Sequence, residues 1–389
     1  MPSPALRSSS VGGMGSSPPP LVCAAHAGAK ARIVEEGGQR ERQRRKRLFV
    51  DQRKGGEAHI AGRAVPESFE IVSGMSTHRL AFLFPGQGSQ AVGMGRDLHE
   101  KFTIARQTFE EADEALGFSI SKLCFEGPED QLKLTEFTQP AIFTVSIAAQ
   151  RVLAEKGIVP SHVAGHSLGE YSANVAAGVL SVSDAVRALR SRGQFMQDAV
   201  PQGQGAMAAI LGMTPEDATR LCSEAAAETG EVVSPANFNS SEQTVISGSA
   251  SAVERASALA KERGAKKVVA LAVSAPFHCA LMQPAQDRLA PRLGEIAFAD
   301  AKVPVAVNVD AALVSKRDAL RDALVRQVTG SVRWIECVRL LIEQQPTHFI
   351  EVGPGKVLSG LMRQIDRSQS CLNVQDEASL EKALAGLQA

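Results

Sequence analysis

The sequence predicts an α/β fold built on a parallel β-sheet with helices on both faces, and a smaller subdomain inserted into it. Short apolar segments alternate with amphipathic segments from residue 79 onward, which is the pattern of strand–helix units in parallel sheets. A serine flanked by glycines, Ser167, lies between one such strand and the helix after it. Residues 205–273 have a strand and helix order of their own. We therefore expect a large α/β domain over 75–204 and 274–389, with the subdomain over 205–273.

The elements of the large domain follow from apolar runs and from the residues that end them. RLAFLF has the apolar character of a buried strand and runs into the glycine turn PGQGSQ. A long apolar segment further along ends at Gly157, and glycine is typical of helix C-termini. The expected elements are, in chain order, a strand at 79–84, a helix at 141–157, a strand at 161–167 and a helix at 168–178.

The smaller subdomain is expected to follow the order βαββαβ. Its first helix opens with Thr214 as the N-cap and has acidic residues in its first turn, where the free N–H groups of a helix favour negative charge. The order βαββαβ is that of the ferredoxin-like split unit. The segments are the strand GAMAAILG, the helix TPEDATRLCSEAAAETG, the strands VVSPANF and QTVISGS, the helix SAVERASALAKERG and the strand KKVVALAV.

Residues 1–74 show no useful helical or strand periodicity and are expected to be disordered. Residues 1–34 lack acidic residues and are rich in Ser and Ala, which is compatible with an organelle transit segment. The remainder carries acidic residues that such segments avoid. The alternative is that translation starts at Met75, and that the upstream sequence is a start-site error or a dispensable tail. The expected compartment is the cytoplasm, or a plastid or mitochondrion if residues 1–74 are a transit peptide.

Composition argues against nucleic-acid, membrane and metal-dependent functions. The 42 basic residues balance the 42 acidic ones, so no overall field attracts nucleic acid or anionic lipid. No apolar run approaches the roughly 20 residues that span a bilayer. The 6 cysteines form no C-x-x-C pair, which gives no support to a metal site and indicates reduced thiols. We expect no metal, no cofactor, and no nucleic-acid or membrane partner.

The segment Gly165-His166-Ser167-Leu168-Gly169 matches the pattern G-x-S-x-G between a predicted strand and a predicted helix. That context is the one that a nucleophile elbow requires, so the large domain is expected to be α/β-hydrolase-like. The turn would lift the Ser167 hydroxyl clear of the sheet, and the N–H of Leu168 would point at an incoming carbonyl oxygen. An ordinary Gly-Ser turn is the alternative that the motif alone leaves open.

A serine nucleophile needs a base, and His278 is the leading candidate. It lies in VSAPFHCALM, after a predicted strand and before a helix, where α/β enzymes place catalytic side chains. His166 is nearer in sequence, but it adjoins the elbow and is expected to point away from Ser167. Considered alone, His278 is also compatible with a capping or a packed core residue.

Five motifs in order carry a family resemblance: FPGQGSQ (84–90), GHSLGEY (165–171), SRGQFMQ (191–197), SAPFHCALM (274–282) and EVGPGKVLSGL (351–361). Together they resemble the malonyl-CoA:acyl carrier protein transacylases of dissociated fatty-acid synthesis. The resemblance covers about residues 79 to 375. It implies a monomer that uses malonyl-CoA and holo acyl carrier protein as substrates and that supplies malonyl groups for elongation.

The resemblance also implies roles for individual residues. Ser167 is the nucleophile and His278 its base, and the side chain of Gln87 with the backbone of Leu168 forms the oxyanion hole. Arg192 holds the free carboxylate of the malonyl group. The match also gives Gln327 as the residue whose backbone carbonyl orients the histidine, Asn239 as an asparagine that lines the site, and Phe277 as the malonyl-selective residue beside the histidine.

General chemistry supports the role of Arg192, because a guanidinium binds a carboxylate through two parallel hydrogen bonds that a lysine cannot match. A surface arginine on the helix DAVRALRSRGQF is the alternative. One departure follows Gln327, where the family often carries Asn-Pro and this chain has Gly330-Ser331, which leaves the local loop geometry open.

Two other functions stay open at this stage. A thioesterase or esterase would use the same serine and histidine, but the HGGG oxyanion motif of esterases is absent and Arg192 would be unexplained. A non-catalytic subunit that binds the carrier would not need Ser167, His278, Arg192 and Gln87 together. A polyketide-type acyltransferase shares the motifs, but its usual neighbouring domains are not in this sequence.

Overall fold

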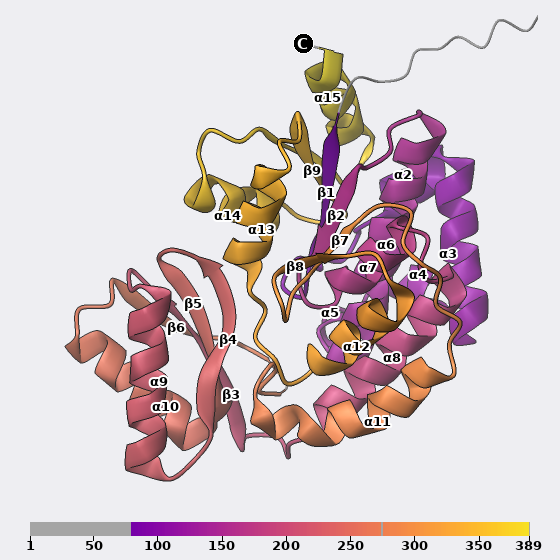
Figure 1. Cartoon of the computed structure of the whole chain (residues 1–389). Coiled ribbons are helices and arrows are strands. Elements are labelled where there is room, and N and C mark those ends of the chain that lie inside the picture. Colours follow the sequence, from indigo (N-terminus) through magenta and orange to yellow (C-terminus); the bar gives the residue numbers. More distant parts are fainter. Residues whose placement is uncertain (1–78, 274, 389) are drawn as a thin grey trace, which may run out of the picture. The chain divides into compact units, whose positions relative to one another are not determined.

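The computed structural model describes residues 79–273 and 275–388 of the chain (Figure 1). The expectations for residues 1–74, on disorder, a transit segment or a start at Met75, lie outside these residues. In the described part of the chain, no helix is at once long enough and apolar enough to cross a bilayer.

The large domain has a central sheet of six strands: β1 (Leu80–Phe84), β2 (His162–Gly165), β7 (Val305–Val307), β8 (Ala312–Val314), β9 (His348–Val352) and β10 (Cys371–Val374). Their spatial order is β10-β9-β1-β2-β7-β8. Neighbours are parallel except β7 and β8, which are antiparallel. Phe84 and Gly165 pair at the carboxyl ends of β1 and β2. The glycine turn after β1 and the Ser167 turn after β2 therefore leave the sheet at the same edge.

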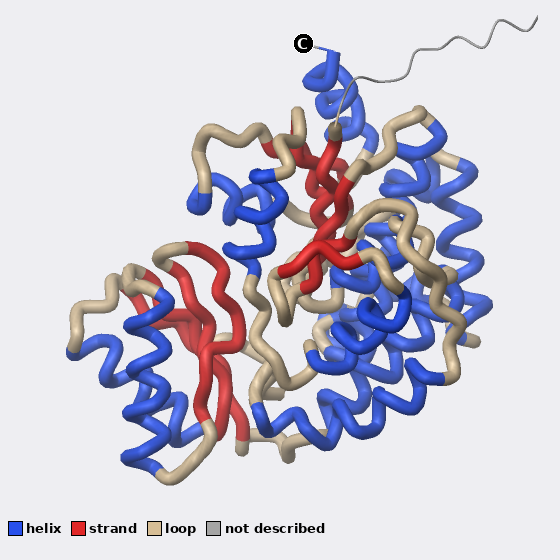
Figure 2. The backbone as a smooth tube through the Cα atoms, viewed as in Figure 1, coloured by secondary structure: helices blue, strands red, loops and turns tan. Residues whose placement is uncertain are grey.

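Helices cover both faces of this sheet (Figures 1 and 2). They are α2 (Arg96–Lys101), α3 (Thr103–Leu116), α4 (Ile120–Glu126), α5 (Glu129–Leu132), α6 (Thr135–Glu155), α7 (Gly169–Ala176), α8 (Val182–Asp198), the 3₁₀ turn η1 (Ala280–Met282), α11 (Gln283–Gly294), α12 (Arg317–Arg326), α13 (Trp334–Glu343), α14 (Val357–Ile365) and α15 (Glu377–Gln388). Successive side chains along β1 point to opposite faces of the sheet and pack against different helices. Phe82 and Phe84 pack in the core with residues of α6, α7 and α8, whereas Ala81 and Leu83 pack with residues of α13 and α14.

Helix α6 differs from the sequence-based expectation, because it begins at Thr135 and not at residue 141. Pro140 lies inside the helix, and proline removes one backbone hydrogen bond there. Most residues of the helix are buried, including Thr138 and Gln139 on the turn before the proline. Packing on the core therefore maintains the helix through Pro140. The difference matters because Gln139 reaches the site described below.

The small subdomain is a four-stranded antiparallel sheet with the order β4-β5-β3-β6. Its elements are β3 (Gly205–Leu211), α9 (Pro215–Thr229), β4 (Val233–Ser240), β5 (Gln243–Ser249), α10 (Ala250–Glu262) and β6 (Lys267–Ala270). The prediction of Thr214 as an N-cap is confirmed, since its Oγ1 accepts the N–H of Asp217 at 3.1 Å. The N–H of Val332 donates to Ala236 O at 2.8 Å, so strand β4 is bonded to a segment of the large domain.

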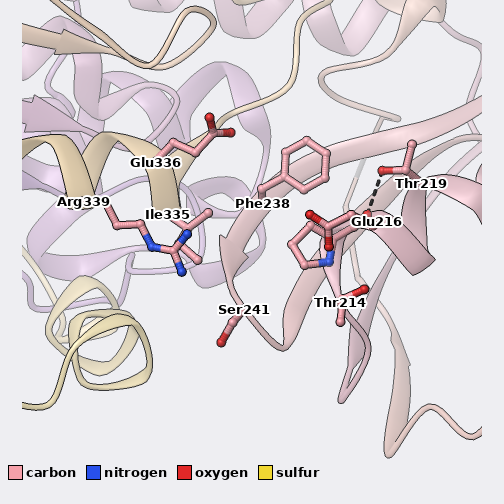
Figure 3. A pocket seen from close by; sticks show the side chains of 9 residues that line it. Thr214, Glu216, Thr219, Phe238, Ser241, Ile335, Glu336 and Arg339 are labelled. Carbon is pink, nitrogen blue, oxygen red and sulfur yellow. Dashed lines mark hydrogen bonds between the residues drawn. The ribbon is translucent and has the colours of Figure 1, made fainter.

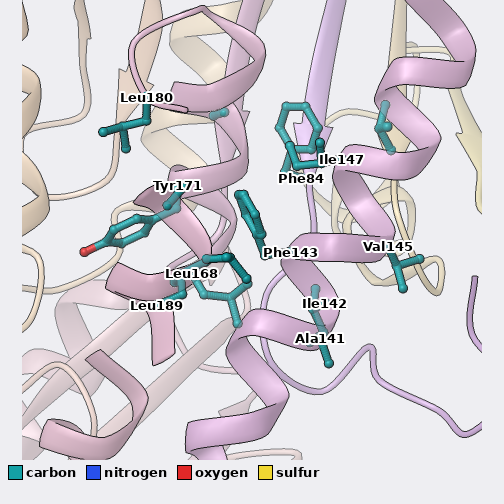
Figure 4. Packing of buried hydrophobic residues seen from close by; sticks show 14 of the residues in the cluster. Phe84, Ala141, Ile142, Phe143, Val145, Ile147, Leu168, Tyr171, Leu180 and Leu189 are labelled. Carbon is teal, nitrogen blue, oxygen red and sulfur yellow. The ribbon is translucent and has the colours of Figure 1, made fainter. Parts of the chain in front are cut away.

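Buried side chains support the turn that carries Ser167 (Figure 4). Phe84, Phe143, Leu168, Tyr171 and Leu189 come from β1, α6, the turn, α7 and α8, and each is at most 1% exposed. They belong to one hydrophobic cluster. Because these contacts come from four separate elements and the turn itself, the position of Ser167 is fixed by the core beneath it.

Candidate active site

Ser167 lies in a sharp turn between β2 and α7, with a φ of 52° that is unusual for a residue other than glycine. The chain segments on either side pass very close to each other. A Cβ atom on Gly165 would lie 1.9 Å from the carbonyl carbon of Gly169, and a Cβ on Gly169 would lie 2.3 Å from Phe84 O. No side chain fits at either glycine, so both are required by the turn. The strained conformation presents the serine hydroxyl at the carboxyl edge of the sheet.

His278 contacts Ser167 directly. Its Nε2 lies 2.8 Å from Ser167 Oγ, and its Nδ1 lies 2.9 Å from the backbone oxygen of Gln327. A carbonyl oxygen can only accept, so Nδ1 carries the proton and Nε2 is free to accept the proton of the serine hydroxyl. Burial, and then the positive charge of Arg192, lower the pKa of His278 to about 3. The imidazole is therefore a neutral base at physiological pH.

Arg192 on α8 is 1% exposed and reaches the same serine. Its Nη2 donates to Ser167 Oγ at 3.2 Å and to Gln327 Oε1 at 2.8 Å, and its Nη1 donates to Gln139 Oε1 at 2.8 Å. All three of these hydrogen-bond acceptors are neutral side chains. Arginine stays protonated in proteins, and a buried charge that is bonded only to neutral groups is costly. The site is therefore suited to an anionic group beside Ser167.

These residues line a cavity of about 400 Å³. It includes six of the eight residues singled out from the sequence, which are Gln87, Ser167, Leu168, Arg192, Phe277 and His278. Gln327 does not line the cavity, but its backbone oxygen bonds His278 and its side-chain oxygen bonds Arg192.

Asn239 was expected to line the site, and it lies next to the cavity without being part of its lining. Its Oδ1 lies 2.9 Å from Nε2 of His166. His166 lines the cavity, as does Asn237 of the same strand, whereas Asn239 does not. Strand β4 has irregular pairing on both sides of Asn237, which a regular alternation of strand side chains does not predict. Asn239 thus acts on the cavity through His166.

The two groups expected to bind an oxyanion are both at the cavity wall. Gln87 Nε2 lies 3.4 Å from Thr135 Oγ1, which is a long contact. Leu168 is the N-cap of α7, and in the described part of the chain its N–H has no hydrogen-bond acceptor. Free N–H groups at a helix N-terminus stabilise negative charge.

Three buried polar residues of the site were not singled out from the sequence. Gln139 binds Arg192, as described above. Asn308, which follows β7, accepts the Ser167 N–H through Oδ1 at 2.8 Å and donates from Nδ2 to Gly165 O at 2.8 Å. Glu170 accepts the Asn308 N–H at 2.8 Å, and burial raises the pKa of its carboxyl to about 7. A signal existed for Asn308, since polar residues just after parallel strands often belong to sites.

A larger cavity of about 730 Å³ lies between the small subdomain and α13 (Figure 3). It is lined in part by Glu216, Phe238, Glu336 and Arg339. Its lining contains no serine–histidine or cysteine–histidine pair, whereas the smaller cavity contains the pair Ser167 and His278. In the described part of the chain, no group of three or more His, Cys, Asp or Glu side chains could hold a metal ion.

Comparisons with known proteins agree on one family. The acyl transferase domain profile matches residues 81–384. The malonyl CoA-acyl carrier protein transacylase of Bacillus subtilis (strain 168) is 48% identical over 309 residues, which are 79% of this chain and 97% of that protein. The enzyme of the same name from Escherichia coli (strain K12) is 48% identical over 307 residues, covering 79% of this chain and 99% of that protein.

Solved structures give the same result. The malonyl CoA-acyl carrier protein transacylase of Coxiella burnetii superposes with a TM-score of 0.78 at 43% identity, over 80% of this chain and 98% of that one. A malonyl-transacylase solved in complex with its type II PKS acyl-carrier protein superposes with a TM-score of 0.77 at 48% identity, over 79% of this chain and 99% of that one.

The lowered pKa of His278 predicts a pH-dependent contribution to stability. A histidine in the unfolded chain takes up a proton near pH 6.5, whereas folded His278 does so only at about pH 3. The unfolded state therefore binds more protons below pH 6.5, and stability falls as the pH falls. Between pH 6.5 and 5 this loss is ~2 kcal/mol. This loss of stability should be present in the wild type and absent in the variant His278→Asn. Asparagine suits this position because it tolerates the positive φ.

The measurement is urea denaturation of both proteins at several pH values, with the difference in unfolding free energy plotted against pH. The other titrating groups are common to both proteins, so they cancel in the difference. If the unfolding free energies of the two proteins change with pH in parallel, folded His278 binds protons much as it does in the unfolded chain.

Proposed function

The chain belongs to the malonyl CoA-acyl carrier protein transacylases of the acyl transferase domain family, and we propose that its reaction is the transfer of a malonyl group from malonyl-CoA to the phosphopantetheine thiol of a holo acyl carrier protein. The chain is an acyltransferase. One observation carries the choice of substrate: the buried guanidinium of Arg192 lies 3.2 Å from the nucleophile Ser167 Oγ, and its hydrogen-bond acceptors are neutral side chains.

The malonyl group would bind with its free carboxylate on Arg192. Gln139 and Gln327 hold the guanidinium through neutral amide oxygens, which leaves its positive charge for the substrate. A carboxylate binds guanidinium through two parallel charge-assisted hydrogen bonds. The carboxylate and thioester carbonyl of a malonyl group are separated by one methylene, so binding at Arg192 brings the thioester to Ser167. This arrangement favours acyl groups that carry a carboxylate over those that do not.

In the first half-reaction, Ser167 Oγ attacks the thioester carbonyl while His278 Nε2 takes the hydroxyl proton. The developing oxyanion would be stabilised by Leu168 N–H and Gln87, the roles that the sequence resemblance implies. The carbon–sulfur bond then breaks, and the imidazolium returns its proton to the departing coenzyme A thiolate. The products are a malonyl ester on Ser167 and free coenzyme A.

In the second half-reaction, the carrier's thiol takes the place of coenzyme A. His278 accepts the thiol proton as the sulfur attacks the malonyl ester, and it then donates this proton to Ser167 as the ester bond breaks. Two substrates that share one serine predict ping-pong kinetics. The product, malonyl on its carrier, supplies fatty-acid elongation. The chemistry as proposed needs only groups of this chain and its two substrates, with no metal or cofactor.

Phe277 would contribute to the choice of donor. It lines the cavity next to His278 and is 8% exposed. A bulky ring at this position would crowd the methyl branch of a methylmalonyl group, so the cavity favours unbranched malonyl. Asn239 would support the site indirectly, by holding His166.

The finer fold assignment is also part of the proposal. A parallel sheet whose second strand ends in a nucleophile turn supports the description of the large domain, over 75–204 and 274–389, as α/β-hydrolase-like. The element order βαββαβ and the sheet order β4-β5-β3-β6 support a ferredoxin-like subdomain over 205–273. Action as a monomer in the cytoplasm remains a prediction.

Ser167→Ala tests the nucleophile. With malonyl-CoA and no carrier, the wild-type chain should gain the mass of one malonyl group, and Ser167→Ala should gain none, because the attacking oxygen is absent. Intact-protein mass spectrometry measures both. A substantial malonyl adduct on the Ser167→Ala protein would reject the assignment, since another residue would then carry the acyl group.

Arg192→Ala tests the carboxylate site. Acylation by malonyl-CoA should slow roughly 100-fold or more, because a buried charge partner of the substrate is removed, while acylation by acetyl-CoA should hold or rise. Arg187→Ala is a matched control on the same helix, since Arg187 is exposed and pairs with Asp184. Stopped-time mass measurements with each donor give both rates. Equal loss on the two donors would remove Arg192 from the carboxylate role.

A further inference from the structure

Glu170 is a buried carboxyl that the steps above do not use. It lies in the first turn of α7 and is 0% exposed. Its Oε2 accepts two hydrogen bonds at 2.8 Å, one from the backbone N–H of Asn308 and one from Nε2 of Gln327. Its Oε1 has no partner among the described residues. A buried carboxyl is costly to maintain, which calls for an explanation in a site that already has its nucleophile and base.

Gln327 connects Glu170 to Arg192. The Gln327 side chain donates from Nε2 to Glu170 Oε2 at 2.8 Å and to Ser167 O at 3.1 Å, and its Oε1 accepts from Arg192 Nη2 at 2.8 Å. If the amide were flipped, its NH₂ group would face the guanidinium and its oxygen would face the carboxyl. Both hydrogen bonds would then be lost and replaced by repulsive contacts. Glu170 accepts a hydrogen bond on one side of the amide and Arg192 donates one on the other. Together they fix a single orientation of the Gln327 amide.

The backbone of Gln327 is held independently of this link. Gln327 caps the C-terminus of α12, and its N–H bonds Ala323 O at 2.9 Å. Its backbone oxygen, which accepts from His278 Nδ1, is therefore positioned by the helix. Glu170 contacts the Gln327 side chain, which bonds Arg192 and Ser167 O, and the backbone N–H of Asn308. It does not contact the Gln327 backbone oxygen that orients His278.

We propose that Glu170 is a positioning residue for substrate selection: by fixing the Gln327 amide, it holds the Arg192 guanidinium in place beside Ser167, and so it sets the preference for acyl groups that carry a carboxylate. This inference rests on the proposed role of Arg192. A shift of about 1 Å in a positioning group can cost on the order of 100-fold in rate, so a residue that touches no substrate can still determine selectivity.

Only one carboxyl oxygen makes the contact, and this property distinguishes two variants. The two hydrogen-bond donors, Asn308 N–H and Gln327 Nε2, both bond to Oε2 of Glu170. A proton on the carboxyl would therefore reside on Oε1 and leave Oε2 as an acceptor. An amide oxygen can serve in the same way. Glu170→Gln therefore keeps an acceptor for Gln327, whereas Glu170→Met fills similar space without one.

The test compares acylation of Ser167 by malonyl-CoA and by acetyl-CoA, followed by intact-protein mass spectrometry in the full chain. Glu170→Met should lose about tenfold or more of the malonyl-over-acetyl preference, while its acetyl rate stays within about threefold of the wild type. Glu170→Gln should retain the preference to within about threefold. An unchanged preference in Glu170→Met would overturn the proposal. Equal loss on both donors, or a Glu170→Gln that behaves like Glu170→Met, would overturn it as well.

Glu351→Met is the matched control for loss of a buried carboxyl. Glu351 is 0% exposed and accepts the N–H groups of Leu358 and Ser359 at 2.9 and 2.8 Å, at the start of α14 and apart from the cavity. Its replacement should lower the melting temperature and leave the donor preference unchanged. A changed preference in this control would mean that any destabilisation alters selectivity, and would overturn the proposal.

Gln327→Met provides a second comparison if Glu170→Met does not fold. It removes the amide that connects Glu170 to Arg192 and keeps the backbone carbonyl. It should show the same loss of preference, and an unaltered preference would reject the inference. Failure of the proposed function has a different signature, because the wild-type chain would then not be acylated by malonyl-CoA.

Discussion

The buried guanidinium of Arg192 is the constraint around which the rest of the site is arranged. A positive charge removed from water is usually neutralised by a carboxylate, but a carboxylate bonded to Arg192 would compete with an acidic substrate. Here Gln139 and Gln327 supply neutral oxygens to the guanidinium. Their dipoles reduce the cost of burial and leave the net charge in place. The buried carboxyl of Glu170 is bonded to Gln327 and to Asn308 rather than to Arg192.

The same charge affects the Ser167–His278 pair. Burial and the proximity of Arg192 both oppose protonation of His278, so its pKa falls to about 3. The imidazole is thus unprotonated at neutral pH, and as a weak base it readily gives up an acquired proton to a leaving thiolate. When a malonyl carboxylate occupies Arg192, part of this opposing charge is cancelled. Substrate binding would then strengthen the base at the moment it is needed.

Local sequence predicted the parts of the site that depend on one turn or one motif. The G-x-S-x-G pattern placed Ser167 because the close approach of Gly165 and Gly169 excludes other residues. The hydrogen-bond network around the Ser167–His278 pair could not be predicted in the same way. Glu170, Asn308 and Gln327 lie on three separate segments and meet only in the folded chain. Gln139 was missed because the expected helix began after Pro140. Asn239 was singled out by the family resemblance alone, and its contact with His166 depends on the fold of strand β4.

The central claim is that Ser167 holds a malonyl group in transit between two thiols. The most direct measurement is the intact mass of the wild-type chain after it is mixed with malonyl-CoA, freed of excess donor, and divided into samples with and without a holo acyl carrier protein. The account predicts a malonyl adduct that persists in the absence of carrier and that moves onto the carrier when the carrier is added. An adduct that is lost to water equally fast in both samples would indicate a hydrolase, and the absence of any adduct would contradict the acyl-enzyme altogether.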